Sequence, residues 1–382
     1  MHNSLLRNLS LTFLVSAVIT ASGCLHFGGQ RSPAGRSSAP VQTVKKEILA
    51  EDRDETTPMT KLEAHTNDLL LSGNFEQLDQ IAHSKRNNKD RLRGGTWQLE
   101  SIYRATSTFY KEYDGQRVTD ELWQARIELL RSWKEKFPSS VTARVALANV
   151  YLDYAWFARG SGTIDTVSES DLRLMRERLN KANEELLAAL DSGMYCPGLY
   201  SQLLYLRMVD GSDRSEFDKI FNEAIRKEPN YITFYQAKAE AVKEKWGGGS
   251  QDWQHFVDSL PEQLAAVGSD EIDIIYFIIV ADKLQDHTFV NNWAILSKDR
   301  IRNGFKEIEE KYTPSNYRLN QFAYIMSVLR LTDEAKAAFK RIGNDRNEAV
   351  WNEKLFTTIK KSIEAQRPQP QRSQKPLKRE IL

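Results

Sequence analysis

Apolar residues recur at spacings of three and four along most of the chain, which is the period of an α-helix with one buried face. The clearest row comprises Leu172, Met175, Leu179, Ala182, Leu186 and Leu190. Prolines and glycines separate such rows and punctuate helices. They include Pro138, Pro197, Pro229 and Pro314, and Gly73, Gly160, Gly211, Gly247 and Gly268. The pattern predicts an all-α protein.

Two segments are apolar on almost every side. Val141–Ala158 is nearly continuous in apolar residues, so we expect a helix that neighbours cover on most of its faces. Ile274–Ala281 contains eight apolar residues, five of them β-branched, and could by itself be a strand. Its flanks follow the helical period and no partner strand is visible, so we predict a buried helix there.

The helices are arranged as repeated pairs. Pro197 and Pro229 are 32 residues apart and enclose a predicted helix over 198–209, a turn at Gly211 and a second helix over 214–228. This length is close to the tetratricopeptide unit of about 34 residues. Further pairs are predicted over 62–83, 230–265 and 315–343. The irregular spacing predicts a degenerate tetratricopeptide-like stack of helix pairs, an α-solenoid, as a helical-repeat domain over 59–365.

The amino terminus has the pattern of an export signal. Leu9–Ala21 is apolar but too short for a stable membrane span, and Ala21-Ser22-Gly23-Cys24 follows it. This phrase resembles the lipobox of bacterial lipoproteins, and the resemblance implies removal of residues 1–23 and lipid attachment to Cys24. The alternatives are an ordinary secretory signal or a plain transmembrane anchor. Since Leu25 is not the aspartate of an inner-membrane retention signal, we expect a cell-envelope protein, at the outer membrane facing the periplasm if the cell is Gram-negative.

Two segments flank the predicted domain. Residues 24–58 are rich in Gly, Ser, Pro and charged residues, which predicts a flexible tether. Residues 366–382 predict a disordered basic tail with five basic residues and one acidic residue, a net charge of 5 − 1 = +4. The tail is either simply solvated or in contact with an anionic envelope surface.

Composition excludes several classes of protein. The 382 residues contain 53 Lys and Arg against 52 Asp and Glu, so the net charge of +1 gives no support to a nucleic-acid binder. The two cysteines exclude a disulfide framework, and Cys196, alone once Cys24 carries lipid, is expected to be a small buried residue. Metal-ligand spacings, nucleotide-binding glycine motifs and a nucleophile elbow are absent. We therefore nominate no catalytic residue, metal ligand or cofactor.

Five short phrases occur in a fixed order across residues 97–351. They are Phe137-Pro138-Ser139-Ser140, Tyr154-Ala155-Trp156-Phe157-Ala158-Arg159-Gly160, Glu228-Pro229-Asn230-Tyr231, Lys245-Trp246-Gly247-Gly248, and Arg341-Ile342-Gly343 ahead of Trp351. They resemble a bacterial family catalogued as domain of unknown function 4034. That resemblance implies a tetratricopeptide-like fold and no settled activity. Lys245 stands where the family pattern has an arginine.

Two of these phrases hold the candidate partner-binding residues. Trp156 and Arg159 could read a carboxylate or phosphate, although Arg159 and Gly160 equally suit the last turn and the end of a helix. Trp246, Gly247 and Gly248, with Trp253 close behind, could present an open loop beside two indoles. The same glycines also suit a sharp reversal between packed helices.

These observations together predict a non-catalytic protein of the cell envelope that is anchored by lipid on Cys24. Its helical-repeat groove is expected to bind a protein or peptide partner. Two alternatives stay open: a glycan-active enzyme of the helical-toroid type, which needs paired carboxylates in a cleft, and a cell-wall or glycan-binding module, which needs an aromatic strip without an acid pair.

The lipid anchor can be tested directly. In the Cys24→Ala variant no diacylglycerol can be attached, so the protein should move from the membrane fraction to the soluble fraction when cells are fractionated. A Cys196→Ala variant is the matched control and should stay with the membrane. Membrane retention of the Cys24→Ala protein would show that the anchor is not this cysteine.

Overall fold

The computed structural model describes residues 60–109, 118–160, 166–284 and 296–366. The predicted signal peptide, Cys24, the predicted tether and all but the first residue of the predicted basic tail lie outside them. Within the described residues the protein consists of helices and contains no strand, so the prediction of an all-α protein is confirmed. The single β-type contact there is an isolated antiparallel bridge between Arg91 and Trp97.

The α-helices, in chain order, have the following bounds. They are α2 (Lys61–Leu71), α3 (Phe75–Asn88), α4 (Gln98–Ser107), α5 (Asp120–Lys136), α6 (Val141–Arg159), α7 (Glu169–Asp191), α8 (Pro197–Val209), α9 (Arg214–Lys227), α10 (Ile232–Ala241), α11 (Asp252–Ala266), α12 (Ile272–Leu284), α13 (Lys298–Lys311), α14 (Asn316–Val328), α15 (Thr332–Ile342) and α16 (Glu353–Ala365). A short 3-10 helix, η2 (Glu244–Trp246), lies between α10 and α11.

Local sequence explains where these helices begin and end. Thr60 and Glu63 form a capping box at the start of α2, and the Ser140 hydroxyl accepts the Ala143 N–H at 3.1 Å at the start of α6. Gly73, between α2 and α3, has a φ of 68°, a conformation that costs a residue with a Cβ atom. Polar caps and glycine turns thus set the lengths of the predicted helix pairs.

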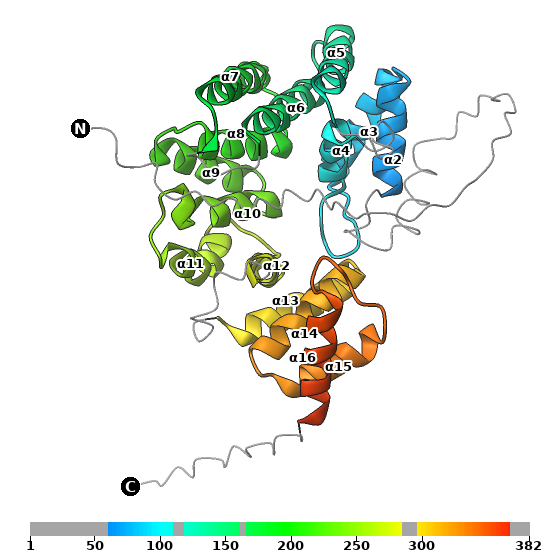
Figure 1. The fold of residues 1–382 in the computed structure, drawn as a ribbon, viewed down its shortest axis with the longest axis vertical. Coiled ribbons are helices and arrows are strands. Elements are labelled where there is room, and N and C mark those ends of the chain that lie inside the picture. Colours follow the sequence, from blue (N-terminus) through cyan, green and yellow to red (C-terminus); the bar gives the residue numbers. More distant parts are fainter. Residues whose placement is uncertain (1–59, 110–117, 161–165, 285–295, 367–382) are drawn as a thin grey trace, which may run out of the picture.

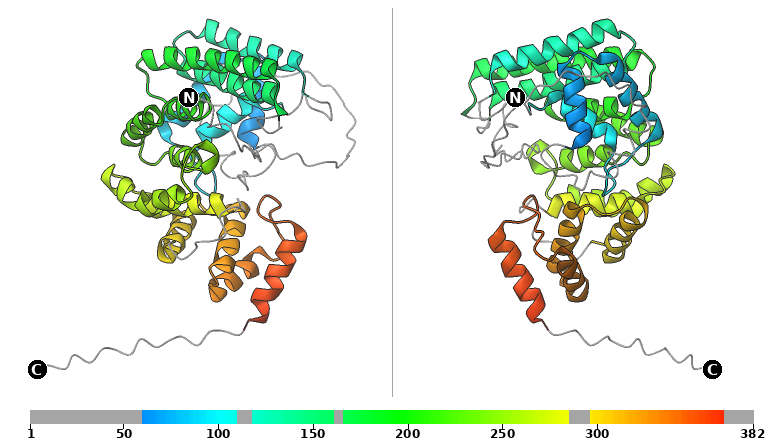
Figure 2. Two further views of the ribbon diagram at one scale, coloured as in Figure 1. Left: turned by 60° about the vertical axis from the view of Figure 1, so that its left-hand side comes forward. Right: turned by 90° about the vertical axis from the view of Figure 1, so that its right-hand side faces the viewer.

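The helices form two rows. The even-numbered helices from α2 to α14 make what we call the central row, in which each helix contacts the next even-numbered one. Odd-numbered helices pack on this row, α7 between α6 and α8, α9 between α8 and α10, and α11 between α10 and α12. From α5 near one end to α16 near the other, the helices follow one another along the long axis of the molecule, and the group formed by α2–α4 lies beside α6 (Figures 1 and 2). This two-row packing is compatible with an α-solenoid.

The two segments that are apolar on all sides are both helices within the central row. Helix α6 contacts α3, α4, α5, α7 and α8, as its sequence predicts. Residues 274–281 form the middle of α12 and are all buried, so the prediction of a buried helix is confirmed there. Helices α10, α11, α13 and α14 surround α12, which explains why its sequence shows no polar stripe.

The buried apolar residues form two cores. One lies among α2–α8 and the other among α8–α16. Trp97 precedes α4, whose Leu99 and Ile102 belong to the first core, yet its own indole belongs to the second. The chain segment before α4 therefore joins the two cores. No described helix is both long enough and apolar enough to cross a membrane.

The packing of α12 on α13 yields a test. Gly304 lies where an added Cβ atom would come within 2.0 Å of the Asp273 carbonyl oxygen and 2.7 Å of the Phe277 Cβ atom. Gly304→Ala should therefore lower the free energy of unfolding by about 1–3 kcal/mol, even though alanine favours helices, because the backbones would have to separate. Thermal or urea unfolding measures this. Lys306→Ala, at an exposed position of the same helix, should change stability little, and equal stability of both variants would refute the close contact.

Candidate functional site

Polar side chains link neighbouring helices of the central row. Asp282, near the end of α12, accepts a hydrogen bond from Gln236 of α10 at 2.6 Å. Its other oxygen accepts from Arg318 and Gln321 of α14, both at 3.2 Å. A carboxylate that is largely shielded from water is thereby held by donors from the helices on both sides. The row has a polar edge as well as an apolar core.

One turn further along α10 lies a second polar group, which we call the Glu240–lysine cluster: Glu240, Lys243, Lys245, Trp246 and Lys283. The Glu240 carboxylate lies 2.8 Å from the Lys243 ammonium, 2.6 Å from Lys245 and 3.0 Å from Lys283. The Trp246 indole N–H donates to the same carboxylate at 3.3 Å. The three lysine side chains are only 8–20% exposed, so these charges act on one another through little water.

The electrostatics of this cluster are unusual for lysine. Burial lowers the pKa of the Lys283 ammonium to about 8, and the neighbouring Lys243 lowers it as well, which together outweigh the opposing effect of Glu240. Burial acts to raise the pKa of Glu240, but Lys283, Lys243 and Lys245 hold it far below its usual value. The Glu240 carboxylate is therefore ionised at neutral pH. The Lys283 ammonium loses its proton near pH 8, well below the range of an ordinary lysine.

Two carboxyl groups of the central row have the opposite shift. Burial raises the pKa of Glu100 on α4 to about 7, against the effects of a hydrogen bond from Thr233 and the charge of Arg104. Burial likewise raises the pKa of Asp153 on α6 to about 6, against a hydrogen bond from Ser107. One Glu100 oxygen, Oε1, is buried and accepts no hydrogen bond. Both groups thus hold a proton more tightly than an ordinary carboxyl group.

The predicted Trp-Gly-Gly loop lies in the Glu240–lysine cluster. Gly247 ends η2 with a φ of 83°, and a Cβ atom on Gly248 would meet the Val242 carbonyl oxygen at 1.9 Å. The N–H groups of Gly247 and Gly248 donate to the carbonyl oxygens of Glu244 and Lys243. The glycines therefore make a tight, internally hydrogen-bonded reversal, which is the packing role that their sequence also suggests.

The other predicted residues lie elsewhere. Trp253 is 5% exposed and belongs to the second core, which leaves its indole little surface for a partner. Trp156 and Arg159 lie at the end of α6, where the Arg159 guanidinium is 5.3 Å from the Trp156 ring and donates to the Gly160 carbonyl oxygen at 3.1 Å. Arg159 is 6% exposed, so it packs over the end of its helix as the capping explanation requires.

Tyr205 on α8 connects these two regions. Its pKa is raised by burial and by the charges of Asp153 and Glu240, and lowered by a hydrogen bond with Trp156. The charges of Asp153 on α6 and of Glu240 in the cluster therefore both act on the Tyr205 phenol. The fold thus brings charges from both regions within electrostatic reach of one residue.

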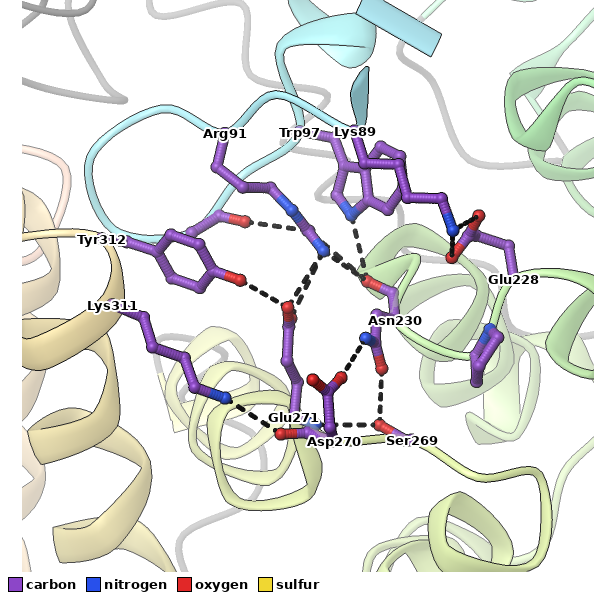
Figure 3. Close-up of polar contacts among 12 residues, drawn as sticks. Lys89, Arg91, Trp97, Glu228, Asn230, Ser269, Asp270, Glu271, Lys311 and Tyr312 are labelled. Carbon is purple, nitrogen blue, oxygen red and sulfur yellow. Dashed lines mark hydrogen bonds and ion pairs between the residues drawn. The ribbon is translucent and has the colours of Figure 1, made fainter. Parts of the chain in front are cut away.

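A separate network, centred on Arg91, joins the two cores (Figure 3). The Arg91 guanidinium lies 3.1 Å from the Glu271 carboxylate and 4.1 Å over the Trp97 ring. It also donates to the carbonyl oxygens of Gly95 and Asn230. The side chains of this ion pair are 8% and 5% exposed. Because its donors face acceptors of the same chain, we interpret this network as structural.

Further contacts surround the ion pair. The Trp97 indole donates to the Asn230 carbonyl oxygen at 3.0 Å, and the Tyr312 hydroxyl donates to Glu271 (Figure 3). The Lys311 ammonium donates to the Asp270 carbonyl oxygen at 3.0 Å. The segment before α4 is thus fastened to the turns before α10 and α12 and to the end of α13.

Sequence reasoning did not nominate Glu240, Lys283 or Arg91. A signal was present for Lys283, because the pair Asp282-Lys283 directly follows eight apolar residues and must lie at the edge of a buried helix. Lys243 and Lys245, which lie just before the Trp-Gly-Gly phrase, were a weaker signal of a charged cluster at that loop. Arg91 had none, since its partner Glu271 is 180 residues away.

Comparisons with protein-family models, curated proteins and solved structures found no match to this chain. The resemblance to domain of unknown function 4034 therefore stays a prediction. Among the described residues, no group of three or more His, Cys, Asp and Glu side chains could hold a metal ion.

The raised pKa of Glu100 predicts a pH-dependent stability. Its folded-state pKa of about 7 exceeds the ordinary 4.5, so folded protein binds this proton more tightly and stability should fall as the pH rises from 4.5 to 7. Glu100→Gln stays neutral, so it should stabilise the protein at pH 8 by an amount on the order of 2 kcal/mol and change little at pH 4. Urea unfolding at both pH values measures this. Glu310→Gln, at an exposed carboxylate, is the control, and a pH-independent effect of Glu100→Gln would contradict the assignment.

Proposed function

We propose that this protein is a non-catalytic, lipid-anchored protein of the cell envelope that binds a protein or peptide partner along its central row. The observation that carries the proposal is the Glu240–lysine cluster beside the exposed glycines Gly247 and Gly249. Charged side chains that are partly shielded from water form strong hydrogen bonds with a partner, because little solvent competes for them.

The architecture supports a binding role. A stack of helix pairs offers a long, repetitive surface that suits an extended segment of another protein. We further propose that pairs such as α8–α9 and α14–α15 are degenerate tetratricopeptide-like repeats. The 32-residue spacing of Pro197 and Pro229, and the alternation of central-row and outer helices, support this proposal.

The envelope location is the second part of the proposal. It depends on the lipobox-like phrase that ends at Cys24 and on the tether of residues 24–58. A tether of 35 residues with flexible composition could place the helical domain several nanometres from the bilayer. The basic tail would add contact with anionic lipid or cell-wall groups.

One observation favours the alternative of a glycan-active enzyme. Glycoside hydrolysis needs a carboxylic acid that is still protonated near neutral pH, and Glu100 and Asp153 both have raised pKa values. Raised values also follow from burial alone, so they count as a reason to test for catalysis rather than as its signature.

Incubation with peptidoglycan separates the three classes of function. In about 1 M salt, which screens contacts of the basic tail, the non-catalytic proposal predicts that full-length protein releases no soluble glycan fragments and does not pellet with the cell wall. Fragment release that is lost in Glu100→Gln or Asp153→Asn would establish the enzyme. Pelleting without cleavage would establish a cell-wall-binding module.

Site-directed photo-crosslinking in cells tests the partner itself. A photoreactive residue at exposed Ser250, beside the Glu240–lysine cluster, should capture one recurring envelope protein. The same probe at exposed Lys306 on α13 should not capture it, and Lys245→Gln should reduce capture at Ser250. Capture that is equal at both positions would contradict a partner site on the central row.

A further inference from the structure

We propose that the Glu240–lysine cluster is a binding site for a carboxylate of the partner, supplied by an acidic segment of its chain. The inference rests on the proposed function and names the chemistry that the partner offers. Three ammonium groups from two separate parts of the chain, the α10–α11 connection and α12, converge on one position.

The geometry already accommodates a carboxylate. Each Glu240 oxygen lies beside two donors, Lys243 and Lys283 for one and Lys245 and Trp246 for the other. The three ammonium groups all lie within 3.0 Å of this one carboxylate, so they are also close to one another and repel. A second carboxylate adjacent to Glu240 would reduce that repulsion.

Burial is the main reason that the charged form of Lys283 is disfavoured. Lys283 remains easier to deprotonate than an ordinary lysine even with Glu240 at 3.0 Å, because burial and Lys243 outweigh the carboxylate. A bound anion favours the charged form of a neighbouring amine. Carboxylate binding near pH 8 should therefore be accompanied by uptake of a proton on Lys283, and binding should weaken as the pH rises above 8.

The glycine loop argues for a carboxylate rather than a phosphate. Phosphate sites characteristically combine cations with several backbone N–H groups that point at the ligand. Here the N–H groups of Gly247, Gly248 and Gly249 donate to Glu244, Lys243 and Asp252 within the loop itself. The site thus offers ammonium groups without backbone N–H donors, a set that suits the smaller charge of a carboxylate.

The direct test measures binding of hexaglutamate, amidated at its carboxyl end, to full-length protein by calorimetry, with hexaglutamine as the uncharged probe. Hexaglutamate should bind and hexaglutamine should not. Affinity should fall between pH 7 and pH 9, and Lys283→Gln should weaken binding about ten-fold and abolish this pH dependence. Lys245→Gln, at a more exposed position, should weaken binding as well and is the second variant if Lys283→Gln fails to fold.

Controls separate this site from other basic regions. Lys306→Gln should bind hexaglutamate as the wild type does. Binding that is unaffected by both Lys283→Gln and Lys245→Gln would place the peptide elsewhere, such as on the basic tail, and would overturn the inference. Stronger competition by inorganic phosphate than by succinate, a dicarboxylate that also carries a charge of about −2 near pH 8, would overturn the carboxylate assignment. Either result would leave the proposed function intact if Ser250 still captured a partner.

Discussion

The buried ion pair between Arg91 and Glu271 is the constraint that holds the segment before α4, and with it the first helices of the stack, against the second apolar core. Removing either partner would leave an uncompensated charge in a nearly dry interface, which typically costs several kcal/mol. The pair is tolerated because the remaining Arg91 donors meet the carbonyl oxygens of Gly95 and Asn230 and because Trp97 covers its face. The segment before α4 is consequently held in one position against α10, α12 and α13.

The central row continues without a break from α2 to α14, and α8, which contributes residues to both cores, links them within the row. That continuity is what brings Glu240 of α10, Lys283 of α12 and Arg318 of α14 to one polar edge. The same row places Glu100 and Asp153 in surroundings where an ionised carboxyl group is disfavoured. The positions and pKa values of these charged groups therefore depend on how the apolar faces of the helices pack.

Local sequence was a good guide to the helices and a poor guide to the site. The helix pair after Pro197 and the buried helix over 274–281 follow from periodicity and punctuation, which act within a few residues. The tryptophan and arginine candidates did not locate the site reliably. A tryptophan in a loop motif looks the same in the sequence whether its side chain packs into the core or contacts a partner. Trp253 lies in the core and Arg159 over a helix end, whereas Trp246 lies beside three lysines.

By itself, the sequence determined the helical class, the buried character of α6 and α12, and the positions of the turns, since each depends on the order of neighbouring residues. It also carries the predicted lipid-attachment phrase at Cys24. Only the tertiary structure decided which charges meet. Arg91 and Glu271 are 180 residues apart, and Glu240 and Lys283 are 43 apart. Coulomb energies and pKa values depend on distance and burial, and both are set by the folded chain rather than by sequence spacing.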